Sequence, residues 1–257
     1  MFKNNNKKSL YFIFIIFFIT CLSSNTLAFE PKTKHNSKTF INFAGVKYNL
    51  IQNGISPNRY IWLHGDEKTA EMALIHHIKN YNGIAFFIDN KTREIPYKST
   101  IVDPNRIFSR NGTYHALRKF QPSWAPGTLK KSLDEIDLER EAFLNILMPP
   151  KEGLLIALHN NFRGYNVMNE EANSQQTSIK KSQNLRDFII CTDLNDFKKL
   201  AEGPFNVVLQ NKTTIADDGS LSWEALRRGV RYLNVETRLG YLTQQKKMLK
   251  FIEEKLN

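Results

Sequence analysis

Residues 60–67 read YIWLHGDE, an apolar run that ends in the pattern His-x-x-Glu. The apolar part has the length of a buried strand, and the residues after Glu67 place apolar side chains at the three- and four-residue spacing of a helix. His64 and Glu67 therefore stand where a strand passes into a helix. Imidazole and carboxylate are both ligands of Zn²⁺, and a catalytic zinc takes three protein ligands. The stretch thus predicts part of a metal site that needs a third ligand elsewhere.

The alternation of strand and helix continues along the chain. Strand patterns occupy residues 58–63, 83–88, 153–158, 186–191, 205–209 and 230–235, and helical patterns occupy 67–80, 134–147, 194–202, 221–228 and 241–256. Continuous apolar strands separated by helices are typical of an α/β fold with a buried sheet. We expect a single domain with a doubly wound, largely parallel sheet flanked by helices. The polar stretch 162–184 is expected to form a long surface loop.

A second strand offers the missing ligand. Residues 154–161 read LLIALHNN, so that His159 stands at the carboxyl end of a buried strand. In open α/β sheets the ligand crevice lies outside the carboxyl ends of the strands, where His64 and His159 can meet. We predict that His64, Glu67 and His159 hold Zn²⁺, although such ligands also suit other divalent ions. A buried core histidine and a helix-start carboxylate remain the alternatives.

Two further stretches carry reactive groups. Residues 234–238 read NVETR and place Glu236 at the end of a buried strand, where it could act as a general base. The alternative is a strand-end carboxylate paired with Arg238. Residues 103–106 read DPNR, and the Arg106 guanidinium could grip a substrate carboxylate or stabilise a carbonyl oxyanion. Asp-Pro-Asn also forms ordinary turns.

Taken in order, these elements resemble the zinc carboxypeptidase clan, near its aspartoacylase and succinylglutamate desuccinylase branch. HGDE at 64–67 looks like the first ligand motif and DPNR at 103–106 like the Asp-Leu-Asn-Arg motif, with proline in place of the apolar residue. His159 looks like the third ligand and Glu236 like the catalytic glutamate. The resemblance implies a metal-activated water that attacks an amide carbonyl.

The resemblance also implies supporting roles. Arg106 would polarise the carbonyl or hold a carboxylate, and Asn105 beside it would contact the substrate. Asp66 and Asp103 would orient a ligand or the arginine. A substrate-clamping tyrosine is assigned to Tyr241, with Tyr232 as the other choice. The short branch bears a C-terminal β-domain, whereas this sequence has a helical pattern soon after Glu236, so we expect a more open cleft that admits a peptide.

The N-terminus predicts the compartment. Basic residues, an apolar segment from Leu10 to Leu22 and small residues up to Ala28 are typical of a secretory signal peptide, so residues 1–28 are predicted to be removed and 29–257 to form the catalytic domain. The apolar run is too short for a stable membrane span. We expect a periplasmic or secreted protein in which Cys191 is a lone, buried thiol.

The charge balance limits the partners. The formal net charge is +11, but the lysines are scattered and form no basic stripe with interleaved aromatics, so a nucleic-acid partner is not expected. We expect an anionic substrate or envelope, and a peptide substrate that could be a murein stem peptide. Two alternatives stay open, namely a deacylase of small N-acyl amino acids and a non-catalytic protein that binds a metal or a peptide.

Overall fold

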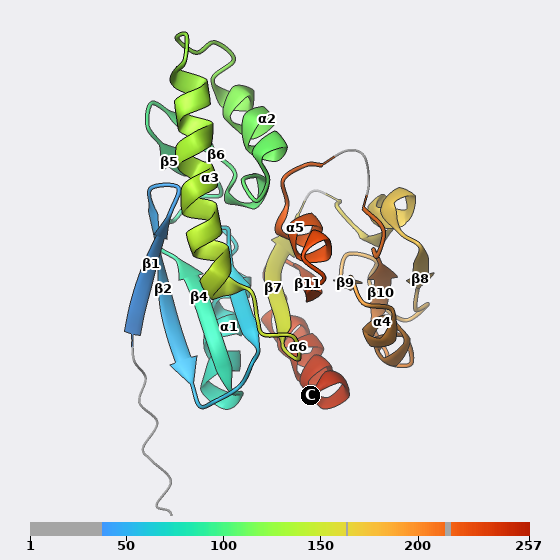
Figure 1. Cartoon of the computed structure of the whole chain (residues 1–257). Coiled ribbons are helices and arrows are strands. Elements are labelled where there is room, and N and C mark those ends of the chain that lie inside the picture. Colours follow the sequence, from blue (N-terminus) through green and yellow to red (C-terminus); the bar gives the residue numbers. More distant parts are fainter. Residues whose placement is uncertain (1–37, 163, 214–216) are drawn as a thin grey trace, which may run out of the picture. The chain divides into compact units, whose positions relative to one another are not determined.

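The two strands that deliver the predicted histidines lie side by side in a nine-stranded sheet (Figure 1). In the computed structural model, which describes residues 38–162, 164–213 and 217–257, the order across this sheet is β1 (Lys38–Phe43), β2 (Val46–Asn53), β4 (Gly83–Ile88), β3 (Arg59–Trp62), β7 (Leu154–Asn161), β11 (Arg231–Arg238), β9 (Phe188–Cys191), β10 (Asn206–Leu209) and β8 (Gln176–Ser178). A separate hairpin joins β5 (Ile95–Tyr97) to β6 (Thr100–Val102).

Strand directions explain why the polar ends gather at one edge. The four central strands, β4, β3, β7 and β11, are parallel to one another, so their carboxyl ends share one edge of the sheet. β9 and β10 are parallel to each other, and β9 is antiparallel to β11. β2 and β8 add antiparallel pairs on the outside. The predicted α/β fold is confirmed, with a mixed sheet whose centre is parallel.

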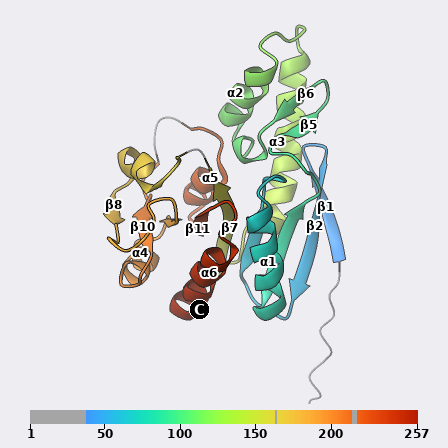
Figure 2. The ribbon, with the colours of Figure 1, turned by 180° about the vertical axis from the view of Figure 1, so that it is seen from behind.

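Helices cover both faces of the sheet. One face carries α1 (Lys68–Asn80), α4 (Leu194–Ala201) and α6 (Leu242–Leu256), of which α6 contacts both others (Figure 2). The opposite face carries α3 (Thr128–Leu147) and α5 (Leu221–Arg227), and α2 (Arg110–Phe120) packs on α3 (Figure 1). Because both faces are covered, all eight residues of β7 are buried. This enclosure accounts for its continuous apolar sequence.

Several predicted elements need correction. The stretch 162–184 is not simply a loop, since it holds the 3-10 helix η2 (Val167–Asn173) and the edge strand β8. The patterns also missed β1, β2 and α2, and η1 (Pro104–Arg106) replaces the simple turn at the DPNR motif. The predicted signal peptide lies outside the described residues. No described helix has the length and apolar character needed to cross a membrane.

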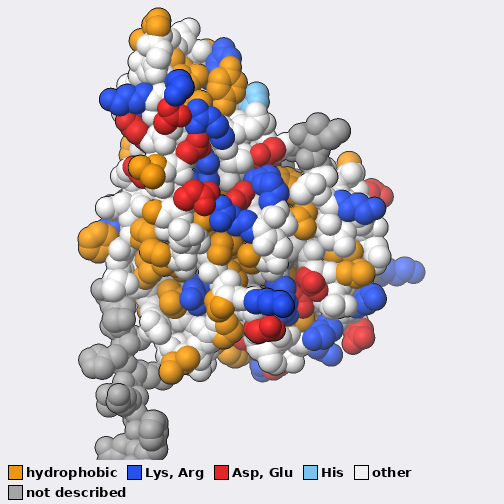
Figure 3. Space-filling view, viewed as in Figure 1, with side chains coloured by type: hydrophobic (Ala, Val, Ile, Leu, Met, Phe, Trp, Pro, Cys, Tyr) orange, Lys and Arg blue, Asp and Glu red, His pale blue; other side chains and the backbone are white. Residues whose placement is uncertain are grey.

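Two remaining expectations concern the core and the surface. Cys191 is fully buried and unpaired by a disulfide, in accordance with its apolar context. On the face shown in Figure 3, Lys and Arg side chains are distributed among Asp and Glu side chains without one extended basic patch. The charge of this face is therefore mixed, although the whole sequence is basic.

Candidate metal centre

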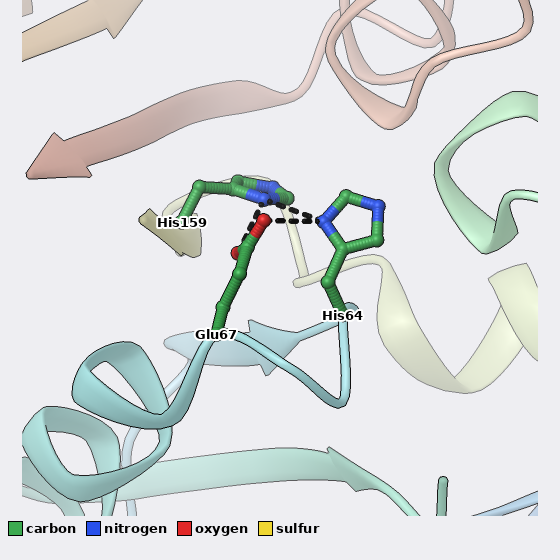
Figure 4. Close-up of side chains that lie close together, drawn as sticks. All are labelled: His64, Glu67 and His159. Atoms are coloured by element: carbon green, nitrogen blue, oxygen red, sulfur yellow. Dashed lines mark hydrogen bonds and ion pairs between the residues drawn. The ribbon is translucent and has the colours of Figure 1, made fainter. Parts of the chain in front are cut away.

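Three side chains from two strand ends and a helix start point toward one another (Figure 4). β3 pairs in parallel with β7, with Trp62 opposite Leu158, so that His64 and His159 emerge at the same edge of the sheet. Glu67 directly precedes α1. The possible ligand atoms of His64, Glu67 and His159 all lie within 4.8 Å of one another, and all three residues are buried.

The spacing of the donor atoms suits a small tetrahedral cation. His64 Nδ1 lies 2.8 Å from Glu67 Oε1 and 3.2 Å from His159 Nδ1, and His159 Nδ1 lies 3.2 Å from Glu67 Oε2. Zinc–ligand bonds of roughly 2.0 to 2.1 Å in a tetrahedron separate neighbouring ligand atoms by about 3.3 Å. Two imidazole nitrogens and a carboxylate are donors that suit a divalent cation, and they lie close enough together to share one.

A carboxylate behind His64 fixes the orientation of its ring. Asp103 Oδ1 lies 2.9 Å from His64 Nε2 and also accepts a hydrogen bond from the Asn105 backbone N–H. With the Nε2 proton donated to Asp103, the Nδ1 lone pair is free to face the centre. His159 Nε2 is buried and has no hydrogen-bond partner among the described residues. The predicted orienting role of Asp103 is thus supported by geometry, whereas the Asp66 side chain is exposed.

A network of buried hydrogen bonds holds the other two predicted ligands, Glu67 and His159. Asn160 donates its backbone N–H to Glu67 Oε2 at 3.1 Å, and its side-chain oxygen accepts from the Ala70 N–H in the first turn of α1. Gln245 on α6 donates to the His159 carbonyl at 3.1 Å. Buried polar groups that satisfy one another in this way restrict the side chains to one arrangement.

The charges of the cluster are strongly coupled. Burial alone would lower the pKa of His64, but the carboxylates of Glu67 and Asp103 raise it to about 9. Burial opposes ionisation of Glu67, yet His64 and His159 hold its pKa well below the usual range. The pKa of Asp103 is likewise lowered, against burial, by His64 and nearby arginines. Without a metal, His64 is therefore a cation between two carboxylates.

Arg93 also belongs to the centre, and the sequence analysis missed it. Its Nη1 donates to Glu67 Oε1 at 2.9 Å, and its Nη2 lies 3.8 Å from Asp103 Oδ2. Gly65 makes this approach possible, because a Cβ atom there would lie 2.2 Å from the Asn90 carbonyl oxygen. The Gly65 N–H donates to the Thr92 carbonyl at 3.1 Å. No pattern around Arg93 marks it, since only the folded turn brings it to Glu67.

Glu236 lies beside His159 on the neighbouring strand. The register of β11 against β7 pairs the two residues directly. Asn161 and Asn234 donate to the Glu236 carboxylate at 3.2 and 3.3 Å. Burial raises the pKa of Glu236, and Glu67 raises it further although His159 opposes the shift. Arg238 pairs with the buried Asp187 at 2.8 Å instead, which argues against the structural alternative of a Glu236–Arg238 pair.

These groups open into a cavity of about 390 Å³. The cavity is lined near the cluster by His64, Glu67, Arg93, His159 and Glu236, and farther out by Asn105, Arg106, Tyr165, Glu170, Ile190, Gln210, Asp218 and Trp223, among others. Asn105 accepts the Leu221 N–H at 2.9 Å through its side-chain oxygen, and Arg106 Nη1 lies 3.6 Å from Asp218 Oδ2. The predicted substrate contacts Asn105 and Arg106 therefore face the same space as the predicted ligands.

The predicted tyrosine does not share this position. Tyr241 is not among the residues that line the cavity, and its half-exposed ring lies against the Arg238 guanidinium, with Cζ 3.6 Å from the ring centroid. The other choice, Tyr232, is almost completely buried. The tyrosine that does line the cavity is Tyr165, from the stretch predicted to be a loop.

Comparison with known proteins gives similarities of overall structure. No protein-family model matches the chain, and no curated protein matches it. A Shewanella baltica protein described as a candidate metallopeptidase has 14% identity and a TM-score of 0.43, with 85% of this chain and 86% of that chain covered. A Shewanella amazonensis protein with the same description has 14% identity and a TM-score of 0.43, with 86% of this chain and 85% of that chain covered. The ectoine utilization protein EutE (DoeB) from Ruegeria pomeroyi has 13% identity and a TM-score of 0.40, with 80% of this chain and 59% of that chain covered.

Proposed function

We propose that this protein is a zinc-dependent hydrolase that cleaves an amide bond of a peptide, as a carboxypeptidase or amidase. The observation that carries the proposal is the buried cluster of His64, Glu67 and His159, whose possible ligand atoms lie within 4.8 Å of one another. A fourth residue, Glu236, supports hydrolysis over simple binding, because its carboxylate lies next to His159 and faces the cavity.

The residues have complementary tasks in this proposal. A divalent ion held by His64, Glu67 and His159 would supply Lewis acidity to a carbonyl and lower the pKa of a water molecule. Glu236 would accept the proton of the attacking water on its carboxylate and return it to the leaving amine. Burial raises the pKa of Glu236, and a higher pKa makes its carboxylate a stronger base. Asn161 and Asn234 hold that carboxylate in place.

Two arginines would bind the negative parts of the substrate. Arg106 and Asn105 line the cavity and would hold a peptide carboxylate. Arg93 touches Glu67 and so lies closer to the reacting carbonyl, whose developing negative charge it would stabilise. Two cations are thus available to the reaction, and Arg93 is the one in contact with a predicted metal ligand.

Substrate and compartment extend the proposal. The predicted signal peptide would deliver the enzyme to the periplasm or outside the cell, where murein stem peptides are available. A deacylase of small N-acyl amino acids uses the same chemistry and is the second enzymatic candidate. A non-catalytic binding protein would need the cluster but would not need Glu236 in the cavity.

Metal content tests the proposal first. Elemental analysis of untagged protein should find one equivalent of zinc in the wild type and loss of zinc in His159→Ala. His115→Ala is the matched control, since His115 is exposed and does not line the cavity. Absence of zinc from the wild type even after zinc is supplied would overturn the proposal. Zinc-loaded enzyme is then assayed on blocked dipeptides, muropeptides and N-acyl amino acids to separate the candidates.

A further inference from the structure

The cavity continues away from the metal ligands across the sheet. Its floor passes from His159 on β7 to Asn234 on β11, to Ile190 on β9 and to Gln210 just after β10, each on the next strand. Neighbouring strands lie about 4.8 Å apart, so Gln210 lies on the order of 14 Å from β7. We call this far part, lined by Tyr165, Glu170, Asn173, Ile190 and Gln210, the side chamber. None of these residues takes part in the proposed hydrolysis.

The side chamber contains the carboxylate of Glu170, which accepts hydrogen bonds from two neutral donors in the described part of the chain. Glu170 Oε1 accepts a hydrogen bond from the Tyr165 hydroxyl, and Oε2 accepts from Gln210 Nε2 at 2.6 Å. Both donors are neutral, and Glu170 has no ion pair with any residue in 38–162, 164–213 and 217–257. Each carboxylate oxygen can accept two hydrogen bonds, so acceptor positions remain open toward the cavity.

The surroundings hold Glu170 in place. The Tyr165 ring packs edge-on against Phe188 with centroids 5.6 Å apart, as part of an apolar cluster with Val167 and Ile190. Burial, and then Glu236 and Glu170, raise the pKa of the Tyr165 hydroxyl, which therefore stays protonated and donates. Gln210 is buried and donates its backbone N–H to the Cys191 carbonyl. Hydrogen bonds from two residues that are themselves packed in the fold therefore hold the Glu170 carboxylate in place.

The charged residues that line the cavity differ in how they are paired. The cavity cations Arg93 and Arg106 lie close to Glu67 and Asp218 respectively. The side chamber offers the Glu170 carboxylate, whose hydrogen-bond donors are neutral, together with apolar surface from Ile190 and the Tyr165 ring. A long side chain that ends in a cation needs both features, because its methylene stem prefers apolar contact and its head needs an acceptor.

We propose that the side chamber binds an ammonium or guanidinium group of the substrate, so that the enzyme selects peptides with a basic side chain next to the cleaved bond. This inference rests on the proposed function for its orientation, since the reacting carbonyl is placed at the metal ligands. The substrate would then present a carboxylate to the arginines and a cation to Glu170.

Kinetic selectivity tests the inference. Zinc-loaded enzyme is assayed on benzoyl-glycyl-lysine and on benzoyl-glycyl-norleucine, which has a similar stem without the charge. We expect kcat/KM to be at least tenfold higher for lysine in the wild type and the ratio to fall toward one in Glu170→Gln. Gln210→Lys, which supplies an internal cation while keeping Glu170, should lower the ratio as well and serves if Glu170→Gln fails to fold. The control Glu171→Gln changes an exposed neighbour that does not line the cavity.

A binding measurement separates this inference from the proposed function. Calorimetry compares Nα-acetyl-lysine with Nα-acetyl-norleucine on the same zinc-loaded variants. Hydrolysis of both dipeptides at equal efficiency would overturn the side-chamber proposal and leave the hydrolase standing. Absence of hydrolysis together with a lysine preference that Glu170→Gln removes would support the chamber and contradict the hydrolase. Absence of both hydrolysis and preference would overturn both.

Discussion

The two ends of the cavity are built in different ways. At the metal end, His64, Glu67, His159 and Glu236 belong to strand ends or a helix start, are at most 7% exposed and interact with charged or titratable groups. In the side chamber, Glu170 and Tyr165 belong to the connection between β7 and β9, are only partly buried and have neutral partners. In the proposed function, the sheet positions the residues that carry out hydrolysis, and a connecting segment supplies the residues that select the substrate.

The largest expected effect tests the metal end. Glu236→Gln should lower kcat by about 10³-fold, because a positioned general base contributes on that scale, while zinc content stays at the wild-type value. Steady-state kinetics and elemental analysis on the same preparation measure both. Glu254→Gln, an exposed carboxylate on α6, is the control. Full activity in Glu236→Gln would remove the general base from the metal end and break the comparison.

A smaller effect is expected one step behind the ligands. Asp103→Asn should weaken zinc binding about 10- to 100-fold, because the ring of His64 loses the carboxylate that orients it and raises its basicity. Competition with a chromophoric chelator measures the affinity. The control is Asp66→Asn, which changes the exposed acid between His64 and Glu67 and should have little effect on zinc affinity. Equal losses in the two variants would mean that contact with His64 is not what matters.

Protons should compete with zinc for His64, so the apparent zinc affinity should depend on pH. The pKa of His64 is raised to about 9 in the metal-free protein, so a proton must leave before Nδ1 can bind a metal. The apparent zinc affinity should therefore rise about tenfold per pH unit from 7 to 9 and flatten above. Chelator competition across this range measures the slope, and a flat profile would contradict the coupling.

The same shift has a consequence for stability without metal. A raised pKa means that protonated His64 stabilises the fold fully below the unfolded value of 6.5, and that this contribution is lost as the pH rises through about 9. Chemical unfolding of chelator-treated protein should show lower stability at pH 9.5 than at pH 6. Zinc should reverse this order, since it binds the deprotonated ring more tightly.

The smallest effect belongs to the side chamber. Tyr165→Phe removes one neutral hydrogen bond to Glu170 but leaves the carboxylate and Gln210, so the lysine-to-norleucine ratio should fall only about fivefold, in keeping with roughly 1 kcal/mol for one hydrogen bond. The same dipeptide kinetics measure it. A loss as large as that in Glu170→Gln would show that Tyr165, and not the carboxylate, makes the selective contact.

The success of the sequence analysis follows from local patterns. Strand and helix periodicity predicted the central strands and their flanking helices, because burial on both faces produces continuous apolar runs. α2 was missed because Asn111-Gly112 indicates a turn in isolation. In the fold, Ser109 caps this helix, and a Cβ atom on Gly112 would lie 2.2 Å from the Gly219 Cα, so glycine is there for close packing.

The sequence by itself determined which residues could serve as ligands, since His64, Glu67 and His159 stand at the ends of apolar runs where side chains reach the edge of a sheet. Only the tertiary structure decided that Arg93 touches Glu67, that Tyr241 lies outside the cavity, and that Glu170 lies inside it. The physical reason is that strand ends are placed by a repeating backbone geometry that a pattern records. Residues on connections are placed by contacts with distant segments, which no local pattern contains.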